Sequence, residues 1–113
     1  MIIFANSRVS GKTTEAIKLA SSTHSILIVP TEDVARMVER MAREMNYPVN
    51  VVSARRYFKN CYEHRTFRGN DKIVIDELDW VLREIFGCEV IMATTTGMTA
   101  ELTIEEPKEL DKH

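Results

Sequence analysis

The chain has 113 residues, of which 44% are hydrophobic and 28% charged, and its formal net charge is −2. This length excludes two packed domains, and the weakly negative charge argues against a protein that is coated with nucleic acid over its whole surface. No apolar run approaches the roughly 18 residues of a membrane span, so we expect a cytoplasmic protein without a membrane partner.

Short apolar runs alternate along the chain with longer amphipathic ones, which is typical of an α/β domain. Runs rich in Ile and Val predict strands at residues 2–5, 25–29, 49–52, 72–76 and 89–94. Helical spacing predicts helices at 12–21, 33–45, 53–62 and 77–86, with Thr31 and Ser53 as N-terminal caps and Gly87 as the stop of the last one. Because the strands are apolar enough to be covered on both faces, we expect a mostly parallel sheet with helices on both faces.

The chain beyond these elements is shorter and more polar. An alternating stretch at 98–104 predicts an edge strand. Carboxylates outnumber lysines in the last residues, so we expect one domain over residues 1–104 and an acidic, flexible tail over 105–113.

The segment between the first strand and the first helix has the composition and context of a phosphate-binding loop. Gly11 allows the backbone to approach an oxyanion, Lys12 supplies a positive charge, and the Thr13 hydroxyl can join a Mg²⁺ shell. A chance occurrence of Gly-Lys-Thr is the alternative. The residues expected to contact the nucleotide here are Asn6, Ser7, Arg8, Val9, Ser10, Gly11, Lys12, Thr13 and Thr14.

Two adjacent carboxylates, Asp76 and Glu77, end the fourth apolar run. Parallel sheets present ligands at this end of their strands, so the pattern predicts a Walker B motif in which Asp76 and Thr13 hold Mg²⁺. Glu77 is then the candidate general base that polarises the attacking water. The alternative is that both carboxylates only cap and charge the start of the next helix.

Together these motifs resemble the RecA-like branch of P-loop ATPases, especially helicase motor domains and the large-terminase ATPases of tailed phages. The resemblance spans about residues 1–97 and implies the strand order 1-5-4-2-3, numbered along the chain. The loop from Ser7 to Thr14 is similar to the terminase loop whose Arg acts in cis on the γ-phosphate, which makes Arg8 a candidate catalytic residue beside Lys12 and Glu77. Thr94 resembles the residue that senses the γ-phosphate.

The resemblance implies ATP and Mg²⁺ as ligands, and ATP hydrolysis that drives or gates work on DNA or RNA in a bacterial or phage-infected cytoplasm. A second RecA-like lobe is not part of the chain, so we expect self-association or a larger complex. The alternatives are a nucleotide-binding adaptor that does not hydrolyse ATP and a kinase similar to thymidine kinase, although the zinc-bearing lasso of that family is missing.

A basic segment follows the third strand. Aromatic residues there are interspersed among the cations Arg55, Arg56, Lys59, Arg65 and Arg68, a pattern that can follow a phosphate backbone and stack bases. The alternative is a solvated basic helix face, with Tyr57 and Phe58 packed in the core.

Overall fold

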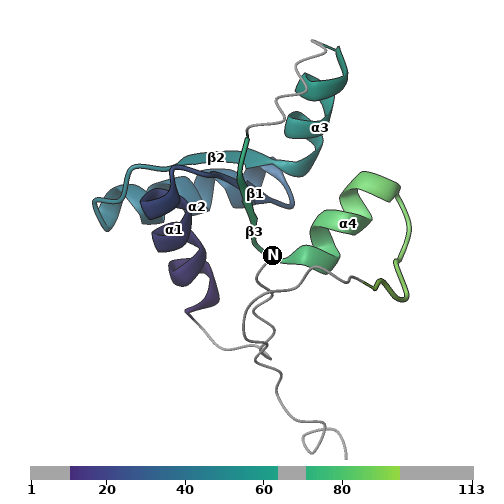
Figure 1. Ribbon diagram of the computed structural model, residues 1–113, viewed down its shortest axis with the longest axis horizontal. Helices are drawn as coiled ribbons and strands as arrows, with labels where there is room; N and C mark the ends of the chain where they lie inside the picture. Colours follow the sequence, from purple (N-terminus) through teal and green to yellow (C-terminus); the bar gives the residue numbers. More distant parts are fainter. Residues whose placement is uncertain (1–10, 64–70, 95–113) are drawn as a thin grey trace, which may run out of the picture.

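The computed structural model describes residues 11–63 and 71–94, which fold into an α/β arrangement of three strands and four helices (Figure 1). The strands are β1 (Ile26–Val29), β2 (Asn50–Ser53) and β3 (Ile73–Ile75). The helices are α1 (Lys12–Thr23), α2 (Glu32–Glu44), α3 (Ala54–Glu63) and α4 (Leu78–Phe86). All strand pairs are parallel and the order is β2-β1-β3, so β1 is central.

Alternate side chains of β1 divide the core into two layers. Leu27 and Val29 are fully buried on one face, against α1 and α2, while Ile28 lies on the other face against α3 and α4. A strand covered on both faces must be apolar throughout, which explains the uninterrupted run of Ile and Val in β1. The expected parallel sheet with helices on both faces is therefore confirmed for the described residues.

The helix boundaries follow local chemistry. The Val34 amide donates to the Thr31 hydroxyl over 3.2 Å at the start of α2, and the Arg56 amide donates to the Ser53 hydroxyl over 3.2 Å at the start of α3. Gly87 ends α4 in the left-handed conformation, with φ of 75°. These two caps and the stop confirm the sequence predictions.

One predicted strand is wrong. Residues 89–94 form no strand and lie exposed, with Ile91 91% and Met92 76% accessible to solvent. An apolar run favours burial but does not supply a pairing partner, and within the described residues β3 pairs only with β1. The expected strands at 2–5 and 98–104 and the tail at 105–113 lie outside the described residues.

None of the four helices in the described part of the chain combines the length and the apolar character that crossing a lipid bilayer requires.

Candidate functional site

The candidate site lies at the carboxyl edge of the sheet. Because the three strands are parallel, their carboxyl ends meet at this one edge. The Asp76 amide donates to the carbonyl oxygen of Ile28 over 3.0 Å, which extends the pairing of β3 with β1 by one residue. This hydrogen bond fixes Asp76 at the end of β3, beside the end of the central strand.

The structure brings Thr13 and Asp76 together across 63 positions of sequence. The Thr13 hydroxyl donates to the Oδ2 atom of Asp76 over 2.9 Å. Asp76 is only 8% exposed, so its carboxylate depends on such partners for the hydrogen bonds that water would otherwise supply. The contact joins the first turn of α1 to the end of β3.

The amino end of α1 has a geometry that suits an anion. Gly11 occupies the capping position with φ of 121°, a conformation that L side chains rarely adopt. As a glycine it has no side chain to satisfy the first amides of the helix, so these N–H groups and the positive end of the helix dipole can face a ligand. Lys12, Thr13 and Thr14 form the first turn directly behind it.

Glu77 has an unusual backbone conformation. Its φ is 65° and its ψ 61°, a left-handed conformation that is uncommon for a residue with a long side chain. It occupies the capping position of α4, yet its exposed side chain makes no capping hydrogen bond. This observation speaks against the alternative in which Glu77 serves as a side-chain cap of the helix.

The residues at this edge fit a magnesium ion. Mg²⁺ is typically held by one or two protein oxygens together with phosphate oxygens and water, and Thr13 and Asp76 provide a hydroxyl and a carboxylate 2.9 Å apart. In the described ranges no group of three His, Cys, Asp or Glu residues is close enough together to hold a metal by itself. The pair therefore suits an ion that arrives with a ligand better than a resident structural metal.

Other predicted site residues are not joined to this pair. Thr94 is exposed and outside any strand, and no hydrogen bond between described residues links it to Thr13 or Asp76. Its expected position relied on the strand at 89–94, which does not form. The loop residues Asn6, Ser7, Arg8, Val9 and Ser10 lie outside the described residues.

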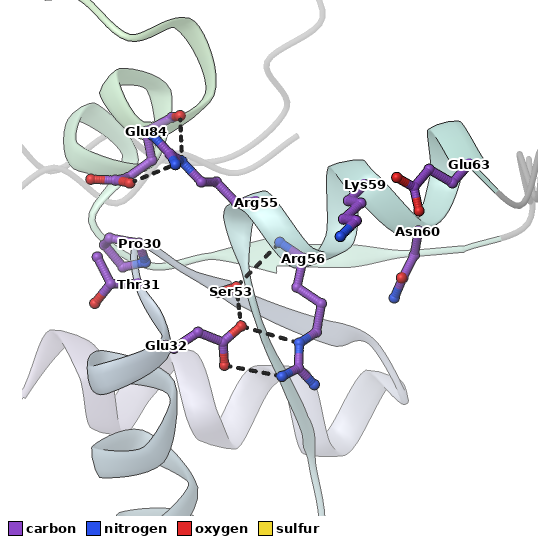
Figure 2. Close-up of a pocket in the computed structure, with 10 residues that line it drawn as sticks. All are labelled: Pro30, Thr31, Glu32, Ser53, Arg55, Arg56, Lys59, Asn60, Glu63 and Glu84. Carbon is purple, nitrogen blue, oxygen red and sulfur yellow. Dashed lines mark hydrogen bonds and ion pairs between the residues drawn. The ribbon is translucent and has the colours of Figure 1, made fainter.

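A second feature at the same edge is a groove of about 680 Å³ beyond the ends of β1 and β2 (Figure 2). Arg56 makes two hydrogen bonds to the Glu32 carboxylate, of 3.1 and 3.3 Å, and Arg55 lies 3.5 Å from a carboxylate oxygen of Glu84. These contacts partly neutralise Arg55 and Arg56, two of the predicted nucleic-acid cations. Arg65 and Arg68 lie outside the described residues. The groove is lined by Pro30, Thr31, Glu32, Ser53, Arg55, Arg56, Lys59, Asn60, Glu63 and Glu84.

Ser53 and Arg56 also determine the charge state of Glu32. The Ser53 hydroxyl donates to the carboxylate over 2.7 Å, and this hydrogen bond lowers the pKa of Glu32 from its ordinary value of 4.5. Burial opposes the shift in part, while the positive charge of Arg56 lowers the pKa further. Glu32 was not among the predicted site residues, and its position just after the Thr31 cap was the only signal available in the sequence.

The two aromatic residues that were expected in the core behave differently. Tyr57 packs against the layer formed by α3 and α4, and its hydroxyl donates to Asp71 over 3.2 Å. Burial, followed by the neighbouring Cys61 and Asp71, raises the pKa of Tyr57 to about 12. Phe58 instead is 57% exposed, and its ring stacks on Tyr62. Sequence reasoning missed Tyr62, although its spacing of four from Phe58 places the two on one helix face.

Comparisons with known proteins found no matching family model, no matching curated protein and no matching solved structure.

Proposed function

We propose that the protein is a small P-loop ATPase that binds Mg²⁺ and ATP at the carboxyl edge of its sheet and hydrolyses the nucleotide to drive or gate a nucleic-acid transaction. The observation that carries the proposal is the 2.9 Å hydrogen bond between Thr13 and Asp76. The Gly-Lys-Thr turn and the Asp-Glu pair were each singled out by their sequence context. Thr13 comes from the first of these motifs and Asp76 from the second, and they meet at the sheet edge where α/β proteins bind ligands.

The residues described at this edge each have a role in the proposal. Lys12 and the first amides of α1 would bind phosphate oxygens, with Gly11 leaving room for their approach. Thr13 and Asp76 would hold Mg²⁺, which when bound neutralises phosphate charge. Glu77, exposed directly beside Asp76, would orient and deprotonate the attacking water. Arg8, which lies outside the described residues, and Thr94, which no hydrogen bond between described residues joins to this pair, stay candidates from the sequence alone, Arg8 for stabilising and Thr94 for sensing the γ-phosphate.

The RecA-like architecture is part of the same proposal. The observed order β2-β1-β3 agrees with the part of the expected order 1-5-4-2-3 that concerns strands 4, 2 and 3. Strand 5 of that order, expected at 89–94, does not form, and strand 1 lies outside the described residues. Ile73 and Ile75 of β3 are 45% and 39% exposed, which leaves apolar surface beside this strand for further elements or for another subunit. Assembly into an oligomer or a complex with nucleic acid belongs to the proposal for this reason.

The test is Glu77→Gln, which keeps the size of the side chain and removes the base. We expect ATP hydrolysis to fall at least about ten-fold, equivalent to about 1.4 kcal/mol of lost transition-state stabilisation, while ATP binding persists. Steady-state phosphate release measures the first effect, and a thermal-shift titration with Mg·ATP measures the second. Unchanged turnover would remove Glu77 from the mechanism, and binding without turnover in the wild type would favour the adaptor that does not hydrolyse ATP.

Lys12→Ala is the companion variant, since it acts on binding rather than on chemistry. A ligand at 100 times its dissociation constant stabilises the native state by about 2.7 kcal/mol, and most of this ATP-dependent shift should be lost in Lys12→Ala. Lys18→Ala, on the exposed side of the same helix, is the matched control. Equal stabilisation of Lys12→Ala and the control would refute the phosphate role of Lys12.

A further inference from the structure

One face of α3 carries cations and aromatic rings in alternation. Arg55, Phe58, Lys59 and Tyr62 follow the spacing i, i+3, i+4 and i+7, which places all four on one side of a helix. We refer to these four residues as the α3 stripe. All four are exposed, with Phe58 57% and Tyr62 75% accessible to solvent.

The rings of the α3 stripe are already arranged in parallel. The centroids of Phe58 and Tyr62 lie 6.4 Å apart with an angle of 5° between the ring planes. Tyr57, which lies on another side of the helix, is partly buried against the core and donates to Asp71, so α3 is anchored by a residue outside the stripe. The two exposed rings are therefore held on a fixed element while their outer surfaces face solvent.

The charges of the stripe complement a polyanion. Its two charged members are both cations. Arg55 uses its Nε atom for the contacts to Glu84, which leaves the terminal nitrogens of its guanidinium for another acceptor. In the described part of the chain no carboxylate forms an ion pair with Lys59, and Figure 2 shows its side chain beside the groove at the sheet edge.

We propose that the α3 stripe binds single-stranded nucleic acid, with bases stacked on Phe58 and Tyr62 and phosphates bound by Arg55 and Lys59. Every base has a π face, so stacking of this kind tolerates different sequences, and it requires bases that are not already paired. A second groove of about 390 Å³ beside the stripe, lined by Arg55, Phe58, Lys59, Glu84, Ile85, Phe86 and Gly87, leaves room for a base next to Phe58. The inference deepens the nucleic-acid part of the proposed function and assigns it a surface.

A protein partner fits the stripe less well. The cores of protein interfaces are depleted in Lys, and an apolar partner would leave the Lys59 ammonium buried without a counter-charge. Nucleic acid instead provides a phosphate beside each base, which matches the alternation of cation and ring.

The experiment measures binding of a fluorescently labelled oligothymidylate of about 20 nucleotides by anisotropy, without ATP or Mg²⁺, because the stripe needs neither. We expect Phe58→Leu and Tyr62→Leu each to weaken binding at least about five-fold, since leucine keeps the apolar bulk but removes the stacking surface. Phe58→Trp keeps an aromatic ring at this position and should bind the oligonucleotide about as tightly as the wild type. A duplex of the same length should bind more weakly than the single strand.

Lys59→Ala tests the electrostatic part. The slope of log K against log salt concentration should decrease in magnitude by about 0.7, the value for one phosphate contact on a single strand. Arg40→Ala, which removes an exposed cation of α2, is the matched control and should leave the slope unchanged.

Three results would overturn the inference: equal binding by wild type and both leucine variants, equal affinity for single strand and duplex, or a wild-type dimer in sedimentation velocity that Phe58→Ala dissociates without any binding of the oligonucleotide.

The thermal shift with Mg·ATP is measured on the same variants. If the wild type shows the thermal shift but does not bind the oligonucleotide, the nucleic-acid inference fails and the ATPase proposal is unaffected. If Lys12→Ala loses the thermal shift but still binds the oligonucleotide, the two sites are separate.

Discussion

At the scale of single residues, the contact between Thr13 and Asp76 has a structural role, to which the proposed function adds a chemical one. The hydrogen bond satisfies the almost fully buried Asp76 carboxylate. It also places the Thr13 hydroxyl and an Asp76 oxygen close enough together for both to bind one divalent cation in place of this hydrogen bond. Hydrogen bonds to charged groups contribute more than those between neutral groups, so the pair should be measurable as a coupling energy.

We predict that a double-mutant cycle of Thr13→Val and Asp76→Ala gives a coupling of about 1–3 kcal/mol in the absence of nucleotide and metal. Thr13→Val leaves the buried Asp76 without this donor, whereas in the double variant neither partner remains. Urea unfolding of the four proteins measures the cycle. Thr14→Val, one position away, is the control for the loss of a hydroxyl in the same turn, and a coupling near zero would show that the contact contributes nothing to the fold.

At the scale of elements, short signals in the chain determine where each helix begins and ends. Thr31 caps α2, Ser53 caps α3, and Gly87 closes α4 in a conformation that other residues adopt only with strain. The beginning of α2 is also the wall of the groove at the sheet edge, because Pro30, Thr31 and Glu32 all line it. Capping therefore positions the wall of this groove as well as stabilising a helix.

Thr31→Ala should destabilise the protein by about 1 kcal/mol, since it removes the acceptor for the Val34 amide. Thr31→Ser keeps the hydroxyl and should cost much less. Chemical denaturation at neutral pH compares the two. If both variants lose the same stability, the hydroxyl is not the stabilising group and the effect comes from the methyl group instead.

At the scale of the whole molecule, the parallel sheet brings together residues that are distant in sequence. Asp76 follows β3, Thr31 follows β1, and Ser53 ends β2, and all three lie at one edge because the strands run in the same direction. The contact from Ser53 to Glu32 ties the end of β2 to the start of α2 across this edge. Because this contact involves the Glu32 carboxylate, which can be protonated, the stability of the protein should depend on pH.

The folded-state pKa of Glu32 is lowered, so its contribution to stability is fully present above the unfolded value near 4.5 and is lost as the pH falls through the folded pKa. We predict that Glu32→Gln destabilises the protein at pH 7 and that the difference from wild type shrinks progressively below about pH 4.5. Because the Glu32 side chain is 45% exposed, solvent screening keeps the effect small. Urea unfolding between pH 7 and pH 3 measures it, and a difference that does not vary with pH would contradict the assignment.

Local chemistry made much of the fold predictable. The Ile-rich and Val-rich runs identified β1, β2 and β3, and the caps and the terminal Gly87 identified the helix boundaries to within about two residues. The strand expected at 89–94 failed because an apolar run does not specify a partner strand. One alternative predicted that Phe58 packs in the core, but in the structure it is exposed. The side of α3 that packs inward carries Ala54 and Tyr57 instead.

The sequence by itself determined the elements and the residue types at the end of β3 and the start of α1, because capping, turn formation and hydrophobic periodicity are local and depend on neighbours a few positions apart. The tertiary structure decided that Thr13 meets Asp76, that Arg55 and Arg56 are held by Glu84 and Glu32, and that the rings of Phe58 and Tyr62 face solvent. Those outcomes depend on how strands pair and which helix face is covered, which are non-local choices made by the packing of the whole chain.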